Sequence, residues 1–264
     1  WLEMDYIGDF WKRHGYLLPR RKVIQVGECR SDHDMLNDLA HRVGQGDHWW
    51  DDFEGGLDHI LEPMGITWQE FKKMDFVRGE VTYEKYKEKG FSTPTQKFEL
   101  YSTLLENWGY DPLPQYREPP ESPVSAPDLH KQYPYILITG ARSPGFFHTE
   151  NRQVPWLREL HRDPVVEIHP DTAAKEGIEE GQWVIIESVR GKIRQRAKIF
   201  AGIHPDVVSA QHAWWFPEKK DPGHGWDESN VNILTDNAYE TCDPAMGATS
   251  VRTLLCKICP EEAQ

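Results

Sequence analysis

The sequence predicts a mixed fold, in which a helical first half with a partial core is followed by a closed β-barrel. In the first half, apolar residues recur every three or four positions, as in amphipathic helices. In the second half, short apolar or alternating runs are separated by glycine and proline turns, a pattern typical of a small barrel. Between them, residues 111–127 contain six prolines, which disfavour helices and central strands. We therefore expect a first domain at residues 1–117, a linker at 118–130 and a barrel domain at 131–264.

The first expected helix covers residues 31–44. Ser31 is a good N-cap, acidic residues follow it in the first turn, and Gly44 suits the C-terminal end. One face of this helix is an apolar stripe made of Met35, Leu36, Leu39, Ala40 and Val43. The stripe predicts a helix that packs on one side.

Two more helices are expected in the first half. Residues 66–71 combine a capping box with a hydrophobic staple, so a helix should begin at Trp68. Residues 101–108 should form another short helix, which ends at Gly109. We expect residues 98–100 to form a strand. The histidines of this half show no pairing with acidic residues that would indicate a metal or catalytic site.

The charge of the chain narrows its classes of partner. The 264 residues carry 43 acidic and 30 basic side chains, a net charge of −13, which disfavours nucleic acid as a general partner. No apolar run approaches the roughly 20 residues that a membrane-spanning helix needs. Because the chain opens on Trp1 rather than Met, we expect it to be a piece of a longer protein, and its localisation stays open.

Four cysteines are too few for a disulfide framework in a chain of this length. Cys256 and Cys259 have the C-x-x-C spacing of zinc or redox sites, but no second pair lies at the spacing of a zinc finger. The pair also falls in an apolar, strand-like run. Both interpretations, structural thiols and a zinc site, therefore stay open.

The barrel domain opens on a strand that ends in a polar loop. Residues 136–138 are apolar, and Thr139 and Gly140 stop the run before Arg142. Glycine lets backbone N–H groups approach an anion closely, and arginine can bind a phosphate with two hydrogen bonds. The simpler alternative is that Thr139 and Gly140 only close the strand.

Further short elements follow at close spacing. We expect a helical turn at 156–161, a helix at 172–176, and strands at 165–168, 183–188, 190–199 and 207–210. The Ile-His-Pro-Asp sequence at 168–171 returns at 203–206, which indicates an internal two-fold repeat. Along residues 190–199, basic side chains alternate with apolar or small ones, so one face should be buried and the other basic. The basic face is either solvated, or it contacts an acidic neighbour or a phosphate.

Four motifs in order resemble one known family: LITGAR with the later HTEN, VEIHPDTAAKEGIEEGQWVIIESVRGKI, QHAWW, and NILT with DPAMG. Together they are similar to the dinucleotide-binding domain at the C-terminus of the molybdopterin oxidoreductases, the dimethyl sulfoxide reductase family. Such domains are six-stranded double-psi β-barrels with short helices. WLEMDYI and FSTPTQKFELYS in the first half resemble the α/β segment that precedes this domain, although Thr95-Gln96 stands where the family often has Ser-Gly.

This resemblance implies an enzyme that uses bis(molybdopterin guanine dinucleotide) with molybdenum or tungsten for oxygen-atom or electron transfer. It implies a [4Fe–4S] cluster and the metal-ligating side chain in an N-terminal region outside this chain, so this fragment alone should be inactive and should supply no metal ligand. The implied partners are that N-terminal remainder and an iron–sulfur electron-transfer subunit. The substrate and the choice of metal stay open.

The resemblance also places candidate site residues. Thr139, Gly140, Ala141 and Arg142 fall where the family contacts one pterin dinucleotide. His148 and Thr149 fall in the loop that approaches the pterin and the metal, and His148 is the catalytic candidate. Gln211, His212 and Asn232 fall at further strand ends that contact the pterin, where amide groups suit a heterocycle edge and otherwise form turns. The rival hypothesis is a stand-alone barrel that binds a protein or peptide without a cofactor.

Overall fold

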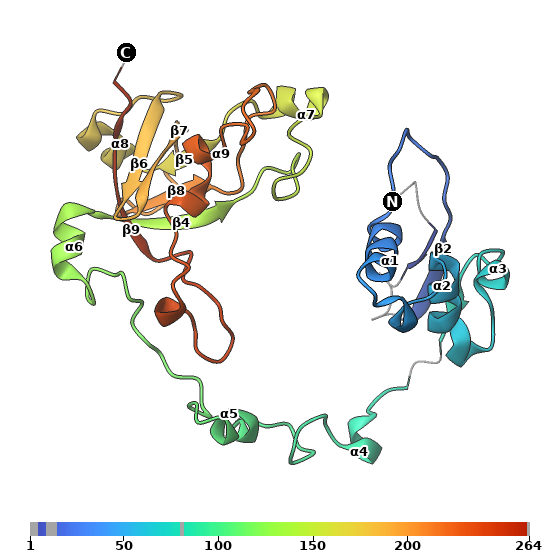
Figure 1. Ribbon diagram of the computed structural model, residues 1–264. Coiled ribbons are helices and arrows are strands. Elements are labelled where there is room, and N and C mark those ends of the chain that lie inside the picture. Colours follow the sequence, from blue (N-terminus) through green and yellow to red (C-terminus); the bar gives the residue numbers. More distant parts are fainter. Residues whose placement is uncertain (1–4, 9–14, 80–81, 263–264) are drawn as a thin grey trace. The chain divides into compact units, whose positions relative to one another are not determined.

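A computed structural model describes residues 5–8, 15–79 and 82–262 of the chain. The chain divides into two compact units, Trp1–Lys97 and Phe98–Gln264, which are described separately (Figure 1). Among the described residues, no helix is both long enough and apolar enough to cross a lipid bilayer.

The first unit combines a small sheet with short helices. Strands β1 (Tyr6–Gly8), β2 (Tyr16–Arg20) and β3 (Val77–Arg78) pair antiparallel in that order. The helices are α1 (Asp32–Arg42), α2 (Phe53–Leu61), α3 (Trp68–Phe71) and α4 (Tyr86–Lys89), with 3₁₀ turns at Gly46–His48 and Glu62–Met64. Its buried core is small and consists of Ile7, Leu57, Leu61, Trp68 and Phe71.

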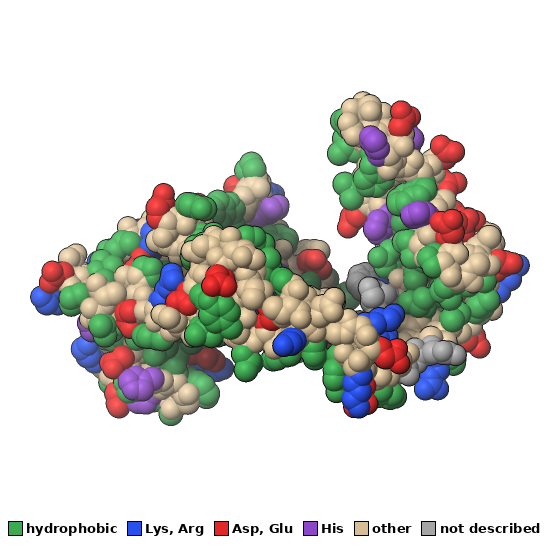
Figure 2. All heavy atoms as spheres, turned by 90° about the horizontal axis from the view of Figure 1, so that it is seen from below, with side chains coloured by type: hydrophobic (Ala, Val, Ile, Leu, Met, Phe, Trp, Pro, Cys, Tyr) green, Lys and Arg blue, Asp and Glu red, His purple; other side chains and the backbone are tan. Residues whose placement is uncertain are grey.

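The predicted helix starts of this unit are confirmed. The Ser31 hydroxyl accepts a hydrogen bond from the Asp34 N–H at 3.0 Å, and Thr67 and Glu70 form the expected capping box. The apolar stripe of α1 is not buried, however: Ala40 is covered, whereas Met35, Leu36, Leu39 and Val43 are 47 to 62% exposed. Apolar side chains on the surface of the molecule are visible in Figure 2.

The second unit contains the barrel. Its strands are β4 (Tyr135–Ala141), β5 (Val165–Ile168), β6 (Trp183–Ser188), β7 (Gly191–Ile199), β8 (Val207–Gln211) and β9 (Leu254–Pro260). They close in the order β4-β8-β5-β7-β6-β9, with β4–β8 and β5–β7 parallel and the other pairs antiparallel. The prediction of a closed six-stranded barrel with short helices is thus confirmed.

Short helices surround or precede the barrel: α5 (Thr103–Asn107), α6 (Pro127–Gln132), α7 (Pro155–Leu160), α8 (Pro170–Glu176), α9 (Trp226–Ser229), and 3₁₀ turns at Val231–Ile233 and Tyr239–Thr241. Helix α6 begins inside the stretch predicted as an extended linker. Pro127 is compatible with it because the first helical position needs no N–H partner. The predicted domain boundaries themselves stay a prediction, and the compact units divide at Lys97.

The expected strand at residues 98–100 is wrong. This segment is in the described part of the chain and forms no strand. Its Glu99 carboxylate accepts hydrogen bonds from the N–H and hydroxyl of Thr103, at 3.1 and 2.9 Å, so the chain turns into α5 instead of extending.

The barrel core forms as the alternation predicts. On β7, Ile193, Gln195 and Ala197 are buried, and they pack inside with residues such as Leu137, Ile168 and Val208. The two Ile-His-Pro-Asp sequences also share local geometry. His169 Nδ1 accepts a hydrogen bond from the Asp171 N–H at 3.2 Å, and His204 Nδ1 accepts one from the Asp206 N–H at the same distance.

Candidate functional site

The parallel strands β4 and β8 end side by side, and this barrel end carries most of the predicted site. Thr139 pairs with Ala210 and Ala141 pairs with Gln211, so the register shifts at Gly140. Gly140 has a φ of +114°, a conformation open to glycine, and no atom lies within 4 Å of the position a Cβ would occupy. The backbone therefore bulges into open space where the strand becomes the loop.

Two histidines meet beside this bulge. His212 Nδ1 lies 3.1 Å from the Ala141 carbonyl oxygen, and His212 Nε2 lies 3.4 Å from His148 Nδ1. The two rings are nearly perpendicular, with centroids 5.4 Å apart. Because a carbonyl oxygen only accepts, we assign the proton of neutral His212 to Nδ1; Nε2 then accepts from the Nδ1–H of His148.

Burial lowers the pKa of His212. The hydrogen bond to Ala141 raises this pKa, whereas the nearby charges of Arg142, His148 and Arg152 lower it further. His212 therefore stays neutral at pH 7, and its Nε2 can accept a hydrogen bond. The neutral form is the one that the assigned hydrogen bonds require.

The loop that carries His148 adopts an unusual backbone. His148 and Asn151 have φ values of +49° and +72°, and Ala213, which follows His212, has +57°. Residues other than glycine rarely adopt this left-handed region, and such strain clusters at functional sites. The loop is fixed to the segment that follows β8, because the Trp215 indole N–H donates to the Thr149 carbonyl oxygen at 2.6 Å.

Arg152 lies beneath this loop. It is 1% exposed, and its guanidinium carbon stacks on the rings of Phe146 and Trp214 at 4.9 and 4.8 Å. Its terminal nitrogens donate to the carbonyl oxygens of His148 and His212, the latter at 3.4 Å. Burial, and then the nearby charge of Arg158, lower the pKa of Arg152 to about 10, so it remains charged at pH 7.

Arg142 has a different environment. It is exposed at the start of the loop, and it forms no ion pair with any acidic side chain of the described residues. Its charge is therefore available to a ligand, together with the open backbone at Gly140.

Comparison with known proteins adds to this geometry. The family described as Molydopterin dinucleotide binding domain matches residues 135–254. A dopamine dehydroxylase from Eggerthella lenta is 47% identical over 173 residues, which cover 64% of this chain and 17% of that protein. The acetylene hydratase of Syntrophotalea acetylenica is 30% identical over 261 residues, 96% of this chain and 36% of that protein.

The solved structure of acetylene hydratase from Pelobacter acetylenicus superposes with a TM-score of 0.89 at 29% identity, over 98% of this chain and 37% of that chain. Residues 135–254 thus match a molydopterin dinucleotide binding domain, and the chain has homologues in the dimethyl sulfoxide reductase family. It spans no more than about 37% of the length of these relatives.

The barrel end suits a molybdopterin-type dinucleotide, the cofactor class of this family. The group is anionic and rich in hydrogen-bonding edges, and the site offers a guanidinium at Arg142 that has no ion pair among the described residues, the exposed imidazole of His148 and open backbone at Gly140. This combination of groups fits the cofactor without any rearrangement of charged pairs.

Not every predicted residue joins this cluster. The Thr139 hydroxyl donates to the Val251 carbonyl oxygen at 2.8 Å, so it holds β4 to the segment before β9. Gln211 is 2% exposed, and its side-chain oxygen accepts from the Val165 N–H at 3.1 Å and pairs with His161 Nε2 at 2.8 Å. Cofactor contact by these two side chains stays a prediction.

Asn232 is exposed in the 3₁₀ turn Val231–Ile233. Its N–H donates to the Asn230 side chain at 3.0 Å, and its carbonyl oxygen accepts from the Thr235 hydroxyl at 3.3 Å. Across the described ranges, no hydrogen bond joins Asn232 to Ala141, His148 or His212. The backbone of Asn232 therefore takes part in a turn, and cofactor contact by its side chain also stays a prediction.

The thiol pair does not form a site. Cys256 is buried in β9 and Cys259 is exposed three residues later, so the side chains lie on opposite faces of the strand. Burial raises the pKa of the Cys256 thiol, which keeps it protonated. In the described ranges, no group of three or more His, Cys, Asp or Glu side chains is arranged to hold a metal ion.

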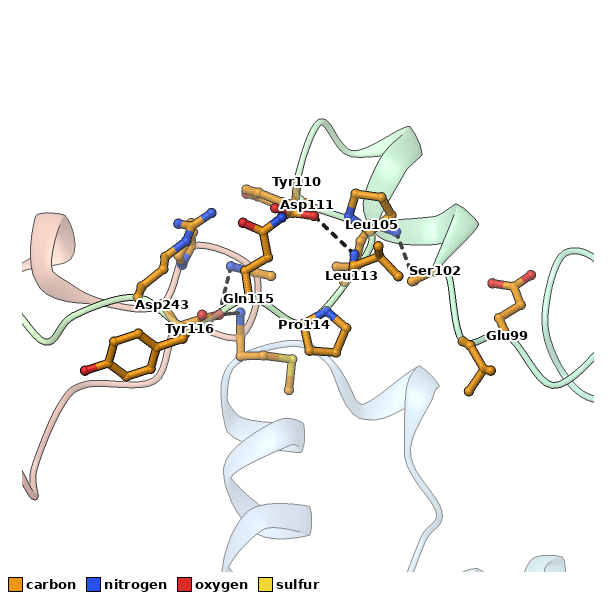
Figure 3. Close-up of a pocket in the computed structure, with 16 residues that line it drawn as sticks. Glu99, Ser102, Leu105, Tyr110, Asp111, Leu113, Pro114, Gln115, Tyr116 and Asp243 are labelled. Carbon is orange, nitrogen blue, oxygen red and sulfur yellow. Dashed lines mark hydrogen bonds between the residues drawn. The ribbon is translucent and has the colours of Figure 1, made fainter.

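A hollow of about 710 Å³ lies elsewhere in the second unit, between residues 99–117 and 243–246 (Figure 3). Asp243, Pro244, Ala245 and Met246 in its wall belong to the DPAMG motif, and the Asp243 carboxylate accepts from the N–H groups of Ala245 and Met246 at 3.1 and 2.7 Å. The residues that line it include no histidine and do not overlap the His148–His212 cluster.

Sequence reasoning missed Arg152. An arginine in a polar loop is usually a surface residue, whereas Arg152 packs against Phe146 and against Trp214, which lies 62 positions later. The sequence feature that could have indicated its burial is the presence of aromatic residues in the neighbouring motifs, at positions 146–147 and 214–215.

Proposed function

We propose that this chain is the C-terminal cofactor-binding portion of an oxidoreductase that uses bis(molybdopterin guanine dinucleotide) with molybdenum or tungsten. The observation that carries the proposal is the barrel end where β4 and β8 meet. Its open Gly140, and its Arg142, which has no ion pair among the described residues, lie inside the matched dinucleotide-binding domain. When bound, the metal–pterin group would supply oxygen-atom or electron transfer.

The residues of this chain would bind and orient that group. Arg142 would bind phosphate oxygens of the dinucleotide, and the backbone around Gly140 and Ala141 would approach it closely. His212 would remain neutral and hold His148 in place. Gln211 and Thr139, whose side chains bond to the protein, would stabilise the strand ends that shape the site.

His148 is the candidate for proton handling beside the substrate. Its Nδ1 is engaged by His212, whereas its Nε2 has no hydrogen-bond partner among the described residues, and the side chain is exposed. We propose that it lines the path by which substrate reaches the metal. Its Nε2 would take a proton from, or return it to, a substrate.

The reaction itself stays a proposal. The similar proteins carry different names, a dopamine dehydroxylase and an acetylene hydratase, so the domain accommodates more than one chemistry. We propose further that the partners are the N-terminal remainder of the same enzyme, which would hold a [4Fe–4S] cluster and the metal ligand, and an iron–sulfur electron-transfer subunit.

The test is cofactor analysis of the full-length protein and two charge variants. Elemental and pterin analysis should find about one molybdenum or tungsten with two pterin dinucleotides per polypeptide. Arg142→Ala should retain roughly tenfold less cofactor, as expected from the loss of charge-assisted bonds to phosphate. Lys192→Ala, which removes another exposed cation of the barrel on β7, is the control and should retain all of it.

Two results would contradict the proposal. One is purified protein, expressed in cells that supply the cofactor, without metal or pterin. The other is equal cofactor content in the Arg142 and Lys192 variants, which would remove the β4 end from the binding site.

A further inference from the structure

Arg152 is a buried cation that has no counter-ion among the residues the structure describes. No Asp or Glu side chain lies within ion-pair distance of it in the described part of the chain, although most other buried or half-buried arginines of the barrel have one. Its Nε–H also lacks a hydrogen-bond partner there. A buried charge without a partner is unfavourable, so its other contacts have to compensate.

Those contacts join two distant segments at one place. One terminal nitrogen of Arg152 donates to the His148 carbonyl oxygen, and the other donates to the His212 carbonyl oxygen. His148 and His212 are 64 positions apart. The guanidinium carbon lies over both Phe146 and Trp214, whose rings meet nearly at right angles with centroids 5.7 Å apart, and these two contacts restrict where its N–H groups can point.

The two segments require such support. His148 and Ala213 both have positive φ values, and backbone in this region persists only where surrounding contacts impose it. Hydrogen bonds from a charged donor are stronger than neutral ones, and here they act on the backbone of both histidines. With the backbone held in this way, His148 Nδ1 and His212 Nε2 lie 3.4 Å apart.

We propose that Arg152 is a positioning residue that aligns His148 and His212 through their carbonyl groups, so that the two imidazoles form one hydrogen-bonded pair. His212 uses its Nδ1–H on Ala141 and accepts the His148 Nδ1–H at Nε2. The pair thereby leaves one basic nitrogen, His148 Nε2. A proton taken there makes His148 an imidazolium that still donates to His212. The functional use of this nitrogen rests on the proposed function, whereas the alignment does not.

The alignment can be measured by the reactivity of each histidine toward diethyl pyrocarbonate, mapped by peptide mass spectrometry on the full-length protein without cofactor. The reagent attacks an unprotonated, accessible ring nitrogen. In the wild-type protein His148 should react at Nε2, and His212 should be protected because both its nitrogens are engaged. In Arg152→Met, which keeps a long apolar side chain against the two rings, His212 should react roughly fivefold faster, as expected when one hydrogen bond is lost.

Arg158→Met is the matched control. Arg158 also stacks on Trp214, at 5.2 Å, but it donates to the Arg162 carbonyl oxygen and to Glu218 rather than to a histidine segment. This variant should leave the reactivity of His212 unchanged. Equal His212 reactivity in wild-type and Arg152→Met protein, or equal increases in both variants, would overturn the inference.

Two additions keep the result decisive. Should Arg152→Met fail to fold by circular dichroism, Arg152→Lys carries the test: it keeps the charge but cannot present two fixed N–H groups, so His212 should again become reactive. Metal content is measured on parallel cofactor-loaded samples. If His212 becomes more reactive in the Arg152 variant but the wild-type protein never binds metal, the alignment is supported and the proposed function is contradicted. If the reactivity of His212 is unchanged and metal content is normal, the alignment is contradicted and the proposed function is supported.

Discussion

The barrel carries positive charge in two regions that differ in how it is balanced. Along β7 and in the turn just before it, four cations each form an ion pair with an acidic residue of the same unit: Arg190, Arg194, Arg196 and Lys198. On the face of this unit drawn in Figure 2, basic and acidic side chains lie next to one another. At the end of β4, Arg142 and Arg152 have no such partner among the described residues. The difference separates cations that hold the barrel together from cations that are available to a ligand or to the backbone.

The ion pairs of β7 show what its basic face contacts, which the alternation of residues in the sequence left open. A basic strand face is compatible with solvent, an acidic neighbour or a phosphate. Acidic residues from α9, β5 and the segments before β4 and after β9 occupy it, including Glu228, Glu167, Glu121 and Glu261. A phosphate would have to displace these carboxylates, which makes the β4 end the better anion site.

The largest stability effect is expected at Arg190, where the ion pairs are least exposed. Arg190→Met removes the only cation that pairs, among the described residues, with Glu121 and Asp236, which are 13% and 20% exposed. Leaving two half-buried carboxylates together should lower the free energy of unfolding by about 2 kcal/mol. Urea denaturation measures it. Cofactor content should not change, and a loss of cofactor with unchanged stability would break the distinction between the two regions.

A smaller, pH-dependent effect is expected at His212. Its pKa is lowered in the folded protein, first by burial and then by Arg142, His148 and Arg152, so the unfolded chain binds a proton more readily. The stability that neutral His212 gives the folded protein is fully present above its unfolded pKa of about 6.5. It is lost as the pH falls below that value. Unfolding midpoints between pH 8 and 5 should decrease less steeply in His212→Gln than in the wild-type protein. Parallel curves would show that His212 is not held neutral.

The smallest effect is expected at Lys198. Its ammonium lies 2.8 Å from Glu167, but the two side chains are 50% and 24% exposed. Exposed pairs contribute little, so Lys198→Ala should change the free energy of unfolding by no more than about 0.5 kcal/mol. Thermal unfolding in low and high salt checks this, and a change comparable with that of Arg190→Met would mean that exposure does not rank the β7 pairs.

Local patterns predicted much of this fold because their causes are local. The N-cap at Ser31, the capping box at Thr67 and the alternation along β7 each depend on residues within a few positions, and the structure confirms all three. The family motifs likewise located the barrel. The strand expected at residues 98–100 failed because a side-chain contact from Glu99 to Thr103 competes with extension.

The site was harder to predict because its contacts are long-range. Thr139, Gly140, Ala141, Arg142, His148, Thr149, Gln211 and His212 were placed at strand ends or loops that indeed meet, but a pattern cannot show which way a side chain turns. Gln211 binds β5 and His161, and Arg152 packs against Phe146 and Trp214, the second of which is distant in the sequence. The exposed stripe of α1 has the same cause, since burial depends on what packs against a helix.

The most direct test of the account is a structure of the full-length protein with its cofactor bound. We predict phosphate oxygens of one dinucleotide within hydrogen-bonding distance of the Arg142 guanidinium, the backbone at Gly140 facing the same group, and the ion pairs of β7 intact. A cofactor bound against β7, or in the hollow between residues 99–117 and 243–246 with Arg142 facing solvent, would contradict the assignment of the β4 end as the binding site.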